Sequence, residues 1–435
     1  MTDAYDAVVI GAGIIGSSVA YGLAAGGRTV AVVDKNPAAG YGSTSSSSAV
    51  IRTFYSTLEG CALAWDGLHY WTGLRDFLGA PADETVADYS ECGCVILRDG
   101  KPDGFDLACK HHDTLGIPYE RWDIPTLKAH CPYLELRRFG PPKRVEDPTF
   151  GEPTGGELTG ALHFPRGGFV NDPQLAARNL ADAAKRADAR FVFNRRVTSV
   201  DRAAGRVSGV TLDDGRQLSA PIVVNAAGPH SSQINALADV LDGMAISTRP
   251  LRQEVNLIPA PVDYNAAPAR YMMTDHDTGA YMRPDGHGNL MIGGMEPECD
   301  PLVWVDDPDS LDRSHTEQWT VQAYRAGLRL PSLGIPGQAT GVVDLYDVTD
   351  DWIPIYDRSD LPGFYLACGT SGNQFKNGPI AGQMMATLID YCEAGNDHDA
   401  EPCRFPLRHV GGSIDMGAFS RRRAVNQDSS MSVMG

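Results

Sequence analysis

Near the start of the chain three glycines, Gly11, Gly13 and Gly16, are spaced as G-x-G-x-x-G, and no other feature constrains the fold as strongly. An apolar run over 5–10 precedes them, and a small-residue stretch over 17–25 follows. The order strand, turn and helix predicts the first crossover of a parallel sheet. In such a turn the glycines allow a tight bend, a close approach to a pyrophosphate, and close packing of helix on strand. A glycine turn with a purely structural role is the alternative.

Asp34 ends the next apolar run, over 29–33, and this placement strengthens the motif. A carboxylate there accepts a hydrogen bond from a ribose hydroxyl, while the helix N-terminus offers free N–H groups and a positive dipole to an anion. The sequence therefore predicts a dinucleotide site in a Rossmann-type domain. Its expected contacts in this region are Gly11, Gly13, Ile14, Ile15, Gly16, Asp34 and Lys35.

Composition limits the other functions open to the chain. With 43% hydrophobic and 21% charged residues it is typical of a globular protein. The net charge of -18 disfavours nucleic acid or an anionic lipid surface as a partner, because both require clustered Lys and Arg. No stretch approaches the roughly 20 apolar residues of a membrane-spanning helix, and 1–6 lacks the basic region of a secretory signal.

The cysteines agree with a reducing compartment. The nine of them are scattered, and the tightest pair, Cys92 and Cys94, has no second pair or histidines at zinc-like spacing. We therefore expect free thiols, no metal site and a cytoplasmic location. The composition does not predict an oligomeric state.

A hydroxyl-rich segment follows Asp34, in which Gly42, Ser43 and Thr44 lead into Ser45–Ser48 and then Ala49–Arg52. On composition alone it could be a flexible linker. Two later segments accompany it, VVNAAG at 223–228 and GTSGNQFKNGPIAG at 369–382. With these landmarks in this order the sequence resembles the D-amino acid oxidase superfamily, and within it the sarcosine oxidase and N-methyl amino acid oxidase branch.

The resemblance covers nearly the whole chain and implies that the dinucleotide is FAD rather than NAD. It also implies that the serine segment wraps the flavin and its phosphates, and that the backbone of Val197 meets the adenine. The further FAD contacts that it implies are Gly42, Ser43, Thr44, Ser46, Ser47, Ser48, Val197, Ala227, Gly228, Gly369, Ser371, Gly372, Asn373, Gln374, Phe375 and Lys376.

The expected fold class is α/β, with a discontinuous Rossmann-type FAD-binding domain and a mixed-sheet α+β substrate domain. Asp172 before Pro173 predicts a helix start. Four short apolar runs from 190 to 219 predict a β-meander, closed by a buried strand over 222–225. The FAD-binding domain is predicted to take 1–88, 159–240 and 338–423, the substrate domain 89–158 and 241–337, and a flexible tail 424–435.

Members of the resembling family can tether the flavin through a His in the serine segment or a Cys late in the chain. Ser46 stands near the first position here and Asp344 near the second. Neither side chain is a suitable nucleophile, so we expect non-covalent FAD.

The substrate is expected to be a small amine or amino acid held with its α-carbon against the flavin. In the resembling family an Arg after the serine segment and a Lys in the C-terminal flavin loop clamp the substrate carboxylate, and Arg52 and Lys376 match them. An Arg fork grips a carboxylate through two hydrogen bonds. Tyr281 matches an aromatic residue of the substrate cavity, although a core tyrosine fits the sequence as well. Ordinary ion pairing at the surface is the alternative for the two cations.

One position departs from the resembling oxidases, which place a Lys near the flavin on the strand that corresponds to 290–293. Met291 stands there, and a thioether cannot stabilise superoxide electrostatically. The electron acceptor is therefore either O₂ or a quinone or electron-transfer flavoprotein.

The preferred function is hydride removal from the carbon next to nitrogen in a secondary or N-methyl amino acid, giving an imine that hydrolyses. Three alternatives stay open at this point. A 2-hydroxy acid dehydrogenase would need a nearby histidine base, for which His230 and His276 are candidates. The others are an amine dehydrogenase component of an electron-transfer assembly and a non-catalytic flavoprotein.

Overall fold

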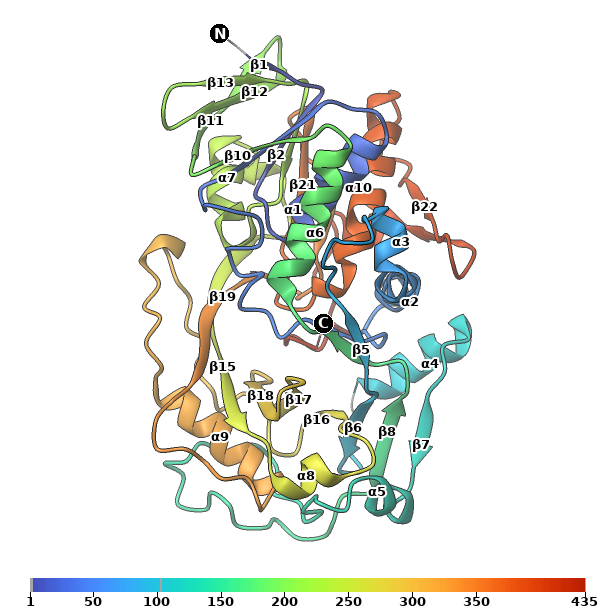
Figure 1. The fold of residues 1–435 in the computed structure, drawn as a ribbon, viewed down its shortest axis with the longest axis vertical. Coiled ribbons are helices and arrows are strands. Elements are labelled where there is room, and N and C mark those ends of the chain that lie inside the picture. The colour runs from blue at the N-terminus through green and yellow to red at the C-terminus, as the bar shows by residue number, and fades with distance from the viewer. Residues whose placement is uncertain (1–2, 102–103, 435) are drawn as a thin grey trace.

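The computed structural model describes residues 3–101 and 104–434, and its two large sheets lie in opposite halves of the molecule (Figure 1). The six-stranded sheet has the order β10-β3-β2-β14-β21-β20, and its neighbours are parallel except for β20 and β21. In this order its strands are Arg190–Phe193, Val30–Asp34, Ala7–Ile10, Ile222–Asn225, Phe364–Cys368 and Ile355–Arg358.

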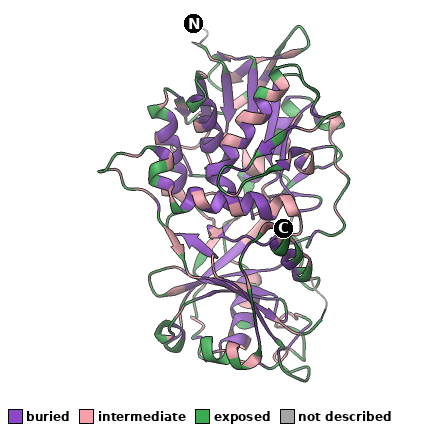
Figure 2. Cartoon of the chain, turned by 90° about the vertical axis from the view of Figure 1, so that its right-hand side faces the viewer, coloured by how far each residue is buried: buried purple, intermediate pink, exposed green. Residues whose placement is uncertain are grey.

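Both faces of this sheet are covered, which explains why its central strands are apolar throughout. Ala7 and Val9 of β2 pack with the helices α1, α2, α6 and α10, whereas Val8 and Ile10 pack against a second sheet on the opposite face. The helices are Ile14–Ala25, Leu58–Thr72, Pro173–Arg186 and Gly378–Glu393. The second sheet has the order β1-β13-β12-β11, with Asp3–Ala4, Gln217–Ser219, Arg206–Leu212 and Val197–Ala203. In Figure 2 the central strands of this half are mostly purple, which marks their residues as buried.

The predicted elements of this half are present, with one difference in their pairing. Asp172 caps α6 by accepting a hydrogen bond from the Leu175 N–H at 2.8 Å. The first strand of the predicted meander, β10, instead lies beside β3 in the parallel sheet. Its alternating pattern suits both neighbours, and only long-range packing decides between them.

The eight-stranded sheet of the other half has the order β19-β15-β18-β17-β16-β6-β8-β7. In this order its strands are Gly341–Thr349, Thr248–Pro259, Asn289–Gly294, Ala280–Pro284, Met272–Asp275, Cys94–Arg98, Gly160–Phe164 and Glu120–Trp122. Helix α9, Glu317–Arg329, packs on β15, β17 and β18. Two strands of this sheet, β8 and β19, lie in segments that were expected in the FAD-binding domain. Both strands are members of the eight-stranded sheet.

The remaining elements connect or flank these layers. The helices are α3 Leu74–Leu78, α4 Phe105–Leu115, α5 Ile124–His130, α7 Ser231–Leu237 and α8 Val262–Ala266. The 3-10 turns are Gly228–His230, Leu241–Gly243, Pro308–Ser310, Phe375–Asn377 and Met416–Phe419. The small sheets comprise β4 Val50–Ile51, β9 Gly168–Val170 and β5 Tyr89–Glu91, and β22 Arg404–Pro406 with β23 Ser413–Asp415. Within 3–101 and 104–434, none of the helices has the length and apolarity to cross a bilayer.

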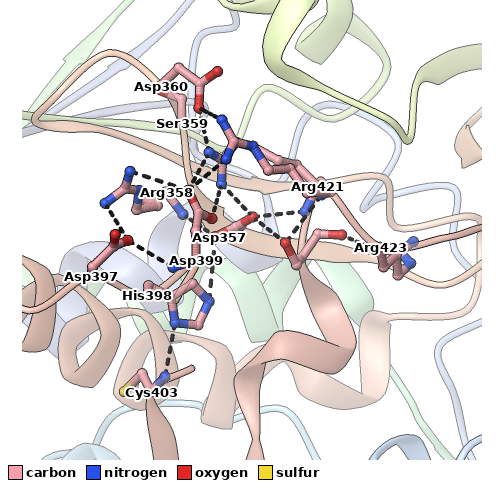
Figure 3. A network of polar contacts seen from close by, with 12 residues as sticks. Asp357, Arg358, Ser359, Asp360, Asp397, His398, Asp399, Cys403, Arg421 and Arg423 are labelled. Carbon is pink, nitrogen blue, oxygen red and sulfur yellow. Dashed lines mark hydrogen bonds and ion pairs between the residues drawn. The ribbon is translucent and has the colours of Figure 1, made fainter. Parts of the chain in front are cut away.

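A buried ionic network fastens the C-terminal segment to the six-stranded sheet (Figure 3). The Arg421 guanidinium, which is fully buried, donates to Asp357 of β20 at 3.0 Å and to both oxygens of Asp399 at 2.9 and 3.0 Å. It also pairs with Asp360, and Asp357 is fully buried as well. Two residues further on, Arg423 pairs with Asp351 at 2.7 Å. These contacts therefore fix the position of the chain at residues 421–423, where the C-terminal segment begins.

We expect Arg421→Met to lower the free energy of unfolding by about 3–5 kcal/mol, because it leaves the buried Asp357 carboxylate without its partner. Urea unfolding of the variant measures this loss. The control is Arg422→Met, which removes a half-exposed cation from the same acidic cluster and should cost no more than about 1 kcal/mol. Equal losses in the two variants would contradict the structural role of Arg421.

Candidate cofactor and substrate site

A cavity of about 470 Å³ runs from the glycine turn before α1 to the eight-stranded sheet. Residues of the turn, the serine segment and the C-terminal loop line one part of it. Strands β15, β16, β17 and β19 line the rest. The cavity thus joins the two halves of the molecule, which is where ligand sites in such folds occur.

The glycine turn at one end of the cavity depends on contacts that only glycine permits. Gly11 has a φ of +104°, and a Cβ there would lie 2.3 Å from the Ala226 carbonyl oxygen. A Cβ on Gly16 would lie 1.9 Å from the Gly11 carbonyl oxygen. Gly13 lines the cavity, so a side chain there would enter it. The turn therefore forms a cradle that a pyrophosphate fits and that larger residues would fill.

Two side chains hold this turn in place. The Asp34 carboxylate accepts hydrogen bonds from the Ala12 N–H at 2.6 Å and the Asn36 N–H at 2.8 Å. The Thr44 hydroxyl accepts from the Ile14 N–H, at the start of α1, at 3.0 Å. Burial raises the pKa of Asp34, while these N–H donors and Lys35 oppose the rise. The carboxylate of Asp34 also lines the cavity, where a ribose hydroxyl can reach it.

An ionic cluster lies at the rim of this end. Asp309, in the turn Pro308–Ser310, pairs with Lys35 and with Arg196 at 2.6 Å. His230 contacts Lys35 at 2.7 Å and Asp309 at 3.1 Å. Burial, and then the charge of Lys35, lower the pKa of His230. His230 is thus committed at the glycine-turn end, while His276 packs on Phe105 and does not line the cavity.

The serine segment is tied to the opposite half by two hydrogen bonds. Ser46 donates to Asp344 of β19 at 2.6 Å, and Ser48 lies 3.1 Å from the Tyr281 hydroxyl. Ser46 and Asp344 are the residues at the two tethering positions of the resembling family. The structure brings them together, and both line the cavity.

Most of the predicted cofactor contacts lie on the wall of the cavity. Those that line it are Gly11, Gly13, Ile14, Ile15, Asp34, Lys35, Gly42, Ser43, Thr44, Ser46, Ser47, Ser48, Val197, Ala227, Gly228, Gly372, Asn373, Gln374 and Phe375. Gly16, Gly369, Ser371 and Lys376 lie behind it. Gly369 and Ser371 act on Asp347, since their N–H groups donate to its carboxylate and carbonyl at 2.6 and 2.7 Å.

The predicted clamp residues differ in their access to the cavity. Arg52 lines it and is held by two main-chain carbonyls, those of Phe54 at 2.9 Å and Val433 at 2.8 Å. Lys376 lies behind Tyr55, with its ammonium 3.7 Å from the centre of the ring, and donates to the Asn373 carbonyl at 3.1 Å. The Arg52 guanidinium lies 4.3 Å from the centre of the same ring. The structure therefore brings the two cations to one aromatic ring, but only Arg52 to the cavity.

Neither of these two cations has an acidic partner among the residues that the structure describes. No carboxylate lies within ion-pair distance of either one in the described parts of the chain, although Arg52 is 7% and Lys376 2% exposed. Burial, and then the charge of Arg52, hold the pKa of Lys376 well below its usual value. Unpaired buried charge is costly. An anion that arrives with a ligand would relieve this cost.

The wall around Arg52 is apolar. Tyr281 lines it, and its ring lies so close over Gly293 that a Cβ there would be 2.3 Å away. Tyr346, which the resemblance implies at the edge of the pocket, also lines the cavity. The sequence did not single out the other residues here, because β16 carries no motif and the tail has the composition of a flexible segment. These are Tyr55, Cys94, Met272, Met273, Thr274, Met282, Val433 and Met434.

Met291 lies outside the lining of the cavity. It is paired with Arg283 of β17, and Tyr281 is paired with Gly293. Paired residues and alternate residues share a face, so Met291 lies on the same face as Tyr281 but further along β18. Its predicted effect on the electron acceptor is not tested by this position.

Comparison with known proteins identifies the family. Residues 6–388 match the DAO family, described as FAD dependent oxidoreductase. The chain belongs to this family. It is an FAD-dependent oxidoreductase, and the predicted family and cofactor are confirmed.

Individual relatives are distant but match over almost their full length. Glycine oxidase of Geobacillus kaustophilus is 25% identical, over 94% of this chain and 99% of its own. Sarcosine oxidase subunit beta of Rhodobacter capsulatus is 24% identical, over 88% of this chain and 84% of its own. The structure of L-proline dehydrogenase from P. horikoshii superposes with a TM-score of 0.75 at 21% identity, covering 97% of this chain and 98% of its own. This last likeness shows the shared fold, so the predicted α/β fold class is confirmed.

We expect FAD to be released when the purified yellow protein is precipitated with acid, because Ser46 and Asp344 form no covalent bond to a flavin. The absorbance of the supernatant near the flavin maximum measures this. A pellet that keeps its colour would contradict the prediction.

Gly13→Val should yield colourless protein, because the new side chain enters the cradle.

Proposed function

We propose that this enzyme removes a hydride from the carbon next to the nitrogen of a small secondary or N-methyl amino acid. The observation that carries the proposal is Arg52, a buried cation at the apolar end of the cavity that has no acidic partner among residues 3–101 and 104–434. A guanidinium matches the geometry of a carboxylate, which it can bind through two hydrogen bonds. The glycine, sarcosine and proline named in the three relatives all carry one, and the last two are secondary amines.

The residues around Arg52 support the positioning of such a substrate. Its carboxylate would bind the N–H groups of Arg52 that the two carbonyls leave free, while Tyr281, Met272 and Met282 offer an apolar wall to N-alkyl groups. The bound FAD supplies the hydride acceptor. The protein contributes orientation and exclusion of water, and the amine reacts in its neutral form. The imine then hydrolyses in water.

Lys376 enters the proposal in a different role from that of the predicted clamp. Its ammonium lies behind Tyr55 and binds the Asn373 carbonyl, so it supports the loop 373–377. Arg52 is the anchor for the carboxylate. The alternative of a 2-hydroxy acid substrate is less well supported, because among the residues of the described chain that line the cavity the one histidine is His230, at the opposite end.

The test of the function is anaerobic mixing of the FAD-loaded protein with a panel of amino acids, the corresponding amines without a carboxylate, and 2-hydroxy acids. We expect N-methyl or cyclic secondary amino acids to bleach the flavin absorbance fastest. Faster bleaching by 2-hydroxy acids would overturn the proposal. No bleaching by any compound would favour a non-catalytic flavoprotein.

Arg52→Ala should lower the rate of flavin reduction per concentration of amino acid by about ten- to hundredfold, because it removes a charge-assisted contact worth roughly 1.5–3 kcal/mol. The corresponding amine should lose little. Arg52→Lys should recover little, since an ammonium lacks the planar fork.

The matched variant is Lys376→Met. Because this ammonium lies behind Tyr55, we expect equal losses on the amino acid and the amine. A loss confined to the amino acid would instead support the predicted clamp, in which Arg52 and Lys376 both bind the substrate carboxylate. Equal losses for Arg52→Ala on both substrates would place the carboxylate elsewhere.

The electron acceptor that we propose is a quinone or an electron-transfer flavoprotein. Among the described residues that line the cavity, Arg52 is the only cation at the apolar end, and Met291 offers no charge. Oxygen reduction benefits from a positive charge that stabilises superoxide. If Arg52 binds the substrate carboxylate, the lining of the apolar end offers no second cation that could stabilise superoxide.

We expect the reduced enzyme to react slowly with oxygen and fast with an artificial acceptor in stopped-flow measurements. Met291→Lys should speed the oxygen reaction about tenfold, because a positive charge near the flavin stabilises superoxide. Leu302→Lys, which adds the same charge at an exposed site, is the control. Fast reoxidation of the unmodified enzyme in air would contradict this prediction.

A further inference from the structure

The segment Ser429–Met434 leaves the surface and ends at the cavity, near the label C in Figure 1. Val433 and Met434 are 9% and 6% exposed. They pack in one apolar cluster with Phe54, Cys94 and Met272, next to Tyr281 and Tyr346. The sequence predicted a flexible tail, but residues 429–434 of this tail pack against the rest of the protein. Their apolar side chains, Val433 and Met434, complete this cluster.

Val433 is held from both sides through its main chain. Its N–H donates to Glu296 at 2.9 Å, and its carbonyl accepts from the Arg52 guanidinium at 2.8 Å. Glu296 also accepts from the Gln253 side chain at 3.0 Å. Its φ is +47°, a left-handed conformation that a glutamate adopts only when its surroundings hold it there. The carboxyl group of Glu296, a residue with a strained backbone, therefore binds both the cavity-lining Gln253 and the main chain of Val433 in the tail.

The base of the segment is anchored as firmly as its tip. Asp351, fully buried, pairs with Arg423 at 2.7 Å, and its carbonyl accepts from the Ser429 hydroxyl at 2.6 Å. Arg421, in the network of Figure 3, fixes the chain just before it. Residues 424–434 are therefore pinned at both ends, and the second pin is Arg52.

The hydrogen bonds leave Arg52 able to bind substrate. A guanidinium has more N–H groups than the two that Phe54 and Val433 take. Carbonyls at both terminal nitrogens fix the plane of the group and so reduce the entropy that is lost when a carboxylate binds. The tail thus orients the anchor and also forms the wall beside it.

We propose that Val433 is a positioning residue for substrate binding, and that Val433 and Met434, at the end of the segment Ser429–Met434, form the specificity-determining wall of the substrate cavity. The proposal rests on the proposed role of Arg52. Through its carbonyl, Val433 holds Arg52 in the orientation that receives a carboxylate. Through their side chains, Val433 and Met434 limit the size of the groups that fit beside it.

The test uses the full-length FAD-loaded enzyme and the pair of substrates with and without a carboxylate. Glu296→Ala releases the Val433 N–H, and Val433→Pro removes that N–H while leaving the Glu296 contact with Gln253 intact. We expect each variant to raise KM for the amino acid about tenfold, with kcat changed less than about twofold and KM for the amine nearly unchanged. Glu296→Gln keeps an acceptor oxygen and should restore the normal KM.

Glu298→Ala, which removes an exposed carboxylate two residues away, is the matched control and should change nothing. Met434→Ala should shift the preference toward longer N-alkyl groups, a change that a general loss of stability would not produce. Arg52→Ala separates the two proposals. If it spares the amino acid, the proposed function fails.

If Arg52→Ala is selective but neither Glu296→Ala nor Val433→Pro raises KM for the amino acid, the positioning role of Val433 is wrong. A lower KM in these variants would also overturn it, because the tail would then compete with the substrate for Arg52. If Met434→Ala leaves the preference among N-alkyl groups unchanged, the proposed role of the tail in limiting substrate size is wrong.

Discussion

The cofactor end of the molecule depends on one backbone contact, the approach of Gly11 to the carbonyl of Ala226. Val8, Val9 and Ile10 of β2 pair with β14, and Ala226 is the residue that follows β14. With a φ of +104° and no room for a Cβ, Gly11 turns the chain toward α1 directly beside this strand. The parallel pairing of two apolar strands and the direction of the α1 N-terminus are thus set by the same contact. The cavity begins there because the turn leaves the N–H groups of α1 facing it.

The other end of the cavity is organised around charge rather than around backbone. Arg52 and Lys376 are buried and lack carboxylate partners in the residues that the structure describes, yet both contact the ring of Tyr55. An aromatic face stabilises a cation without neutralising it. A site that keeps its cation in this way stays ready for a ligand anion, whereas a salt bridge would have to break first. Burial, and then the charge of Arg52, lower the pKa of Lys376 well below its usual value.

The sequence predicted the cofactor end far better than the substrate end, and the reason is physical. At Gly11 and Asp34 the chemistry follows from neighbours within a single strand-turn-helix unit, so local spacing carries the signal. Val197, Gly372 and Phe375 followed from a resemblance, not from spacing. Met272 and Val433 were missed because their positions depend on pairing between segments far apart in the chain. Lys376 was placed in the clamp because its loop matched, but the rotation of a single side chain behind Tyr55 is not encoded in a motif.

Net charge also misleads when it is applied to a site. The chain carries -18, yet five basic side chains and four acidic ones line the cavity. The acidic groups there are committed to the protein: Asp34 binds the glycine turn, Asp309 binds Lys35, and Asp344 binds Ser46. Burial raises the pKa of the fourth, Asp347, to about 7, which reduces its negative charge near neutral pH. The pyrophosphate of FAD therefore meets a cavity lined by slightly more basic than acidic side chains inside an acidic protein, and contacts within a low-dielectric cavity outweigh screened charges on the surface.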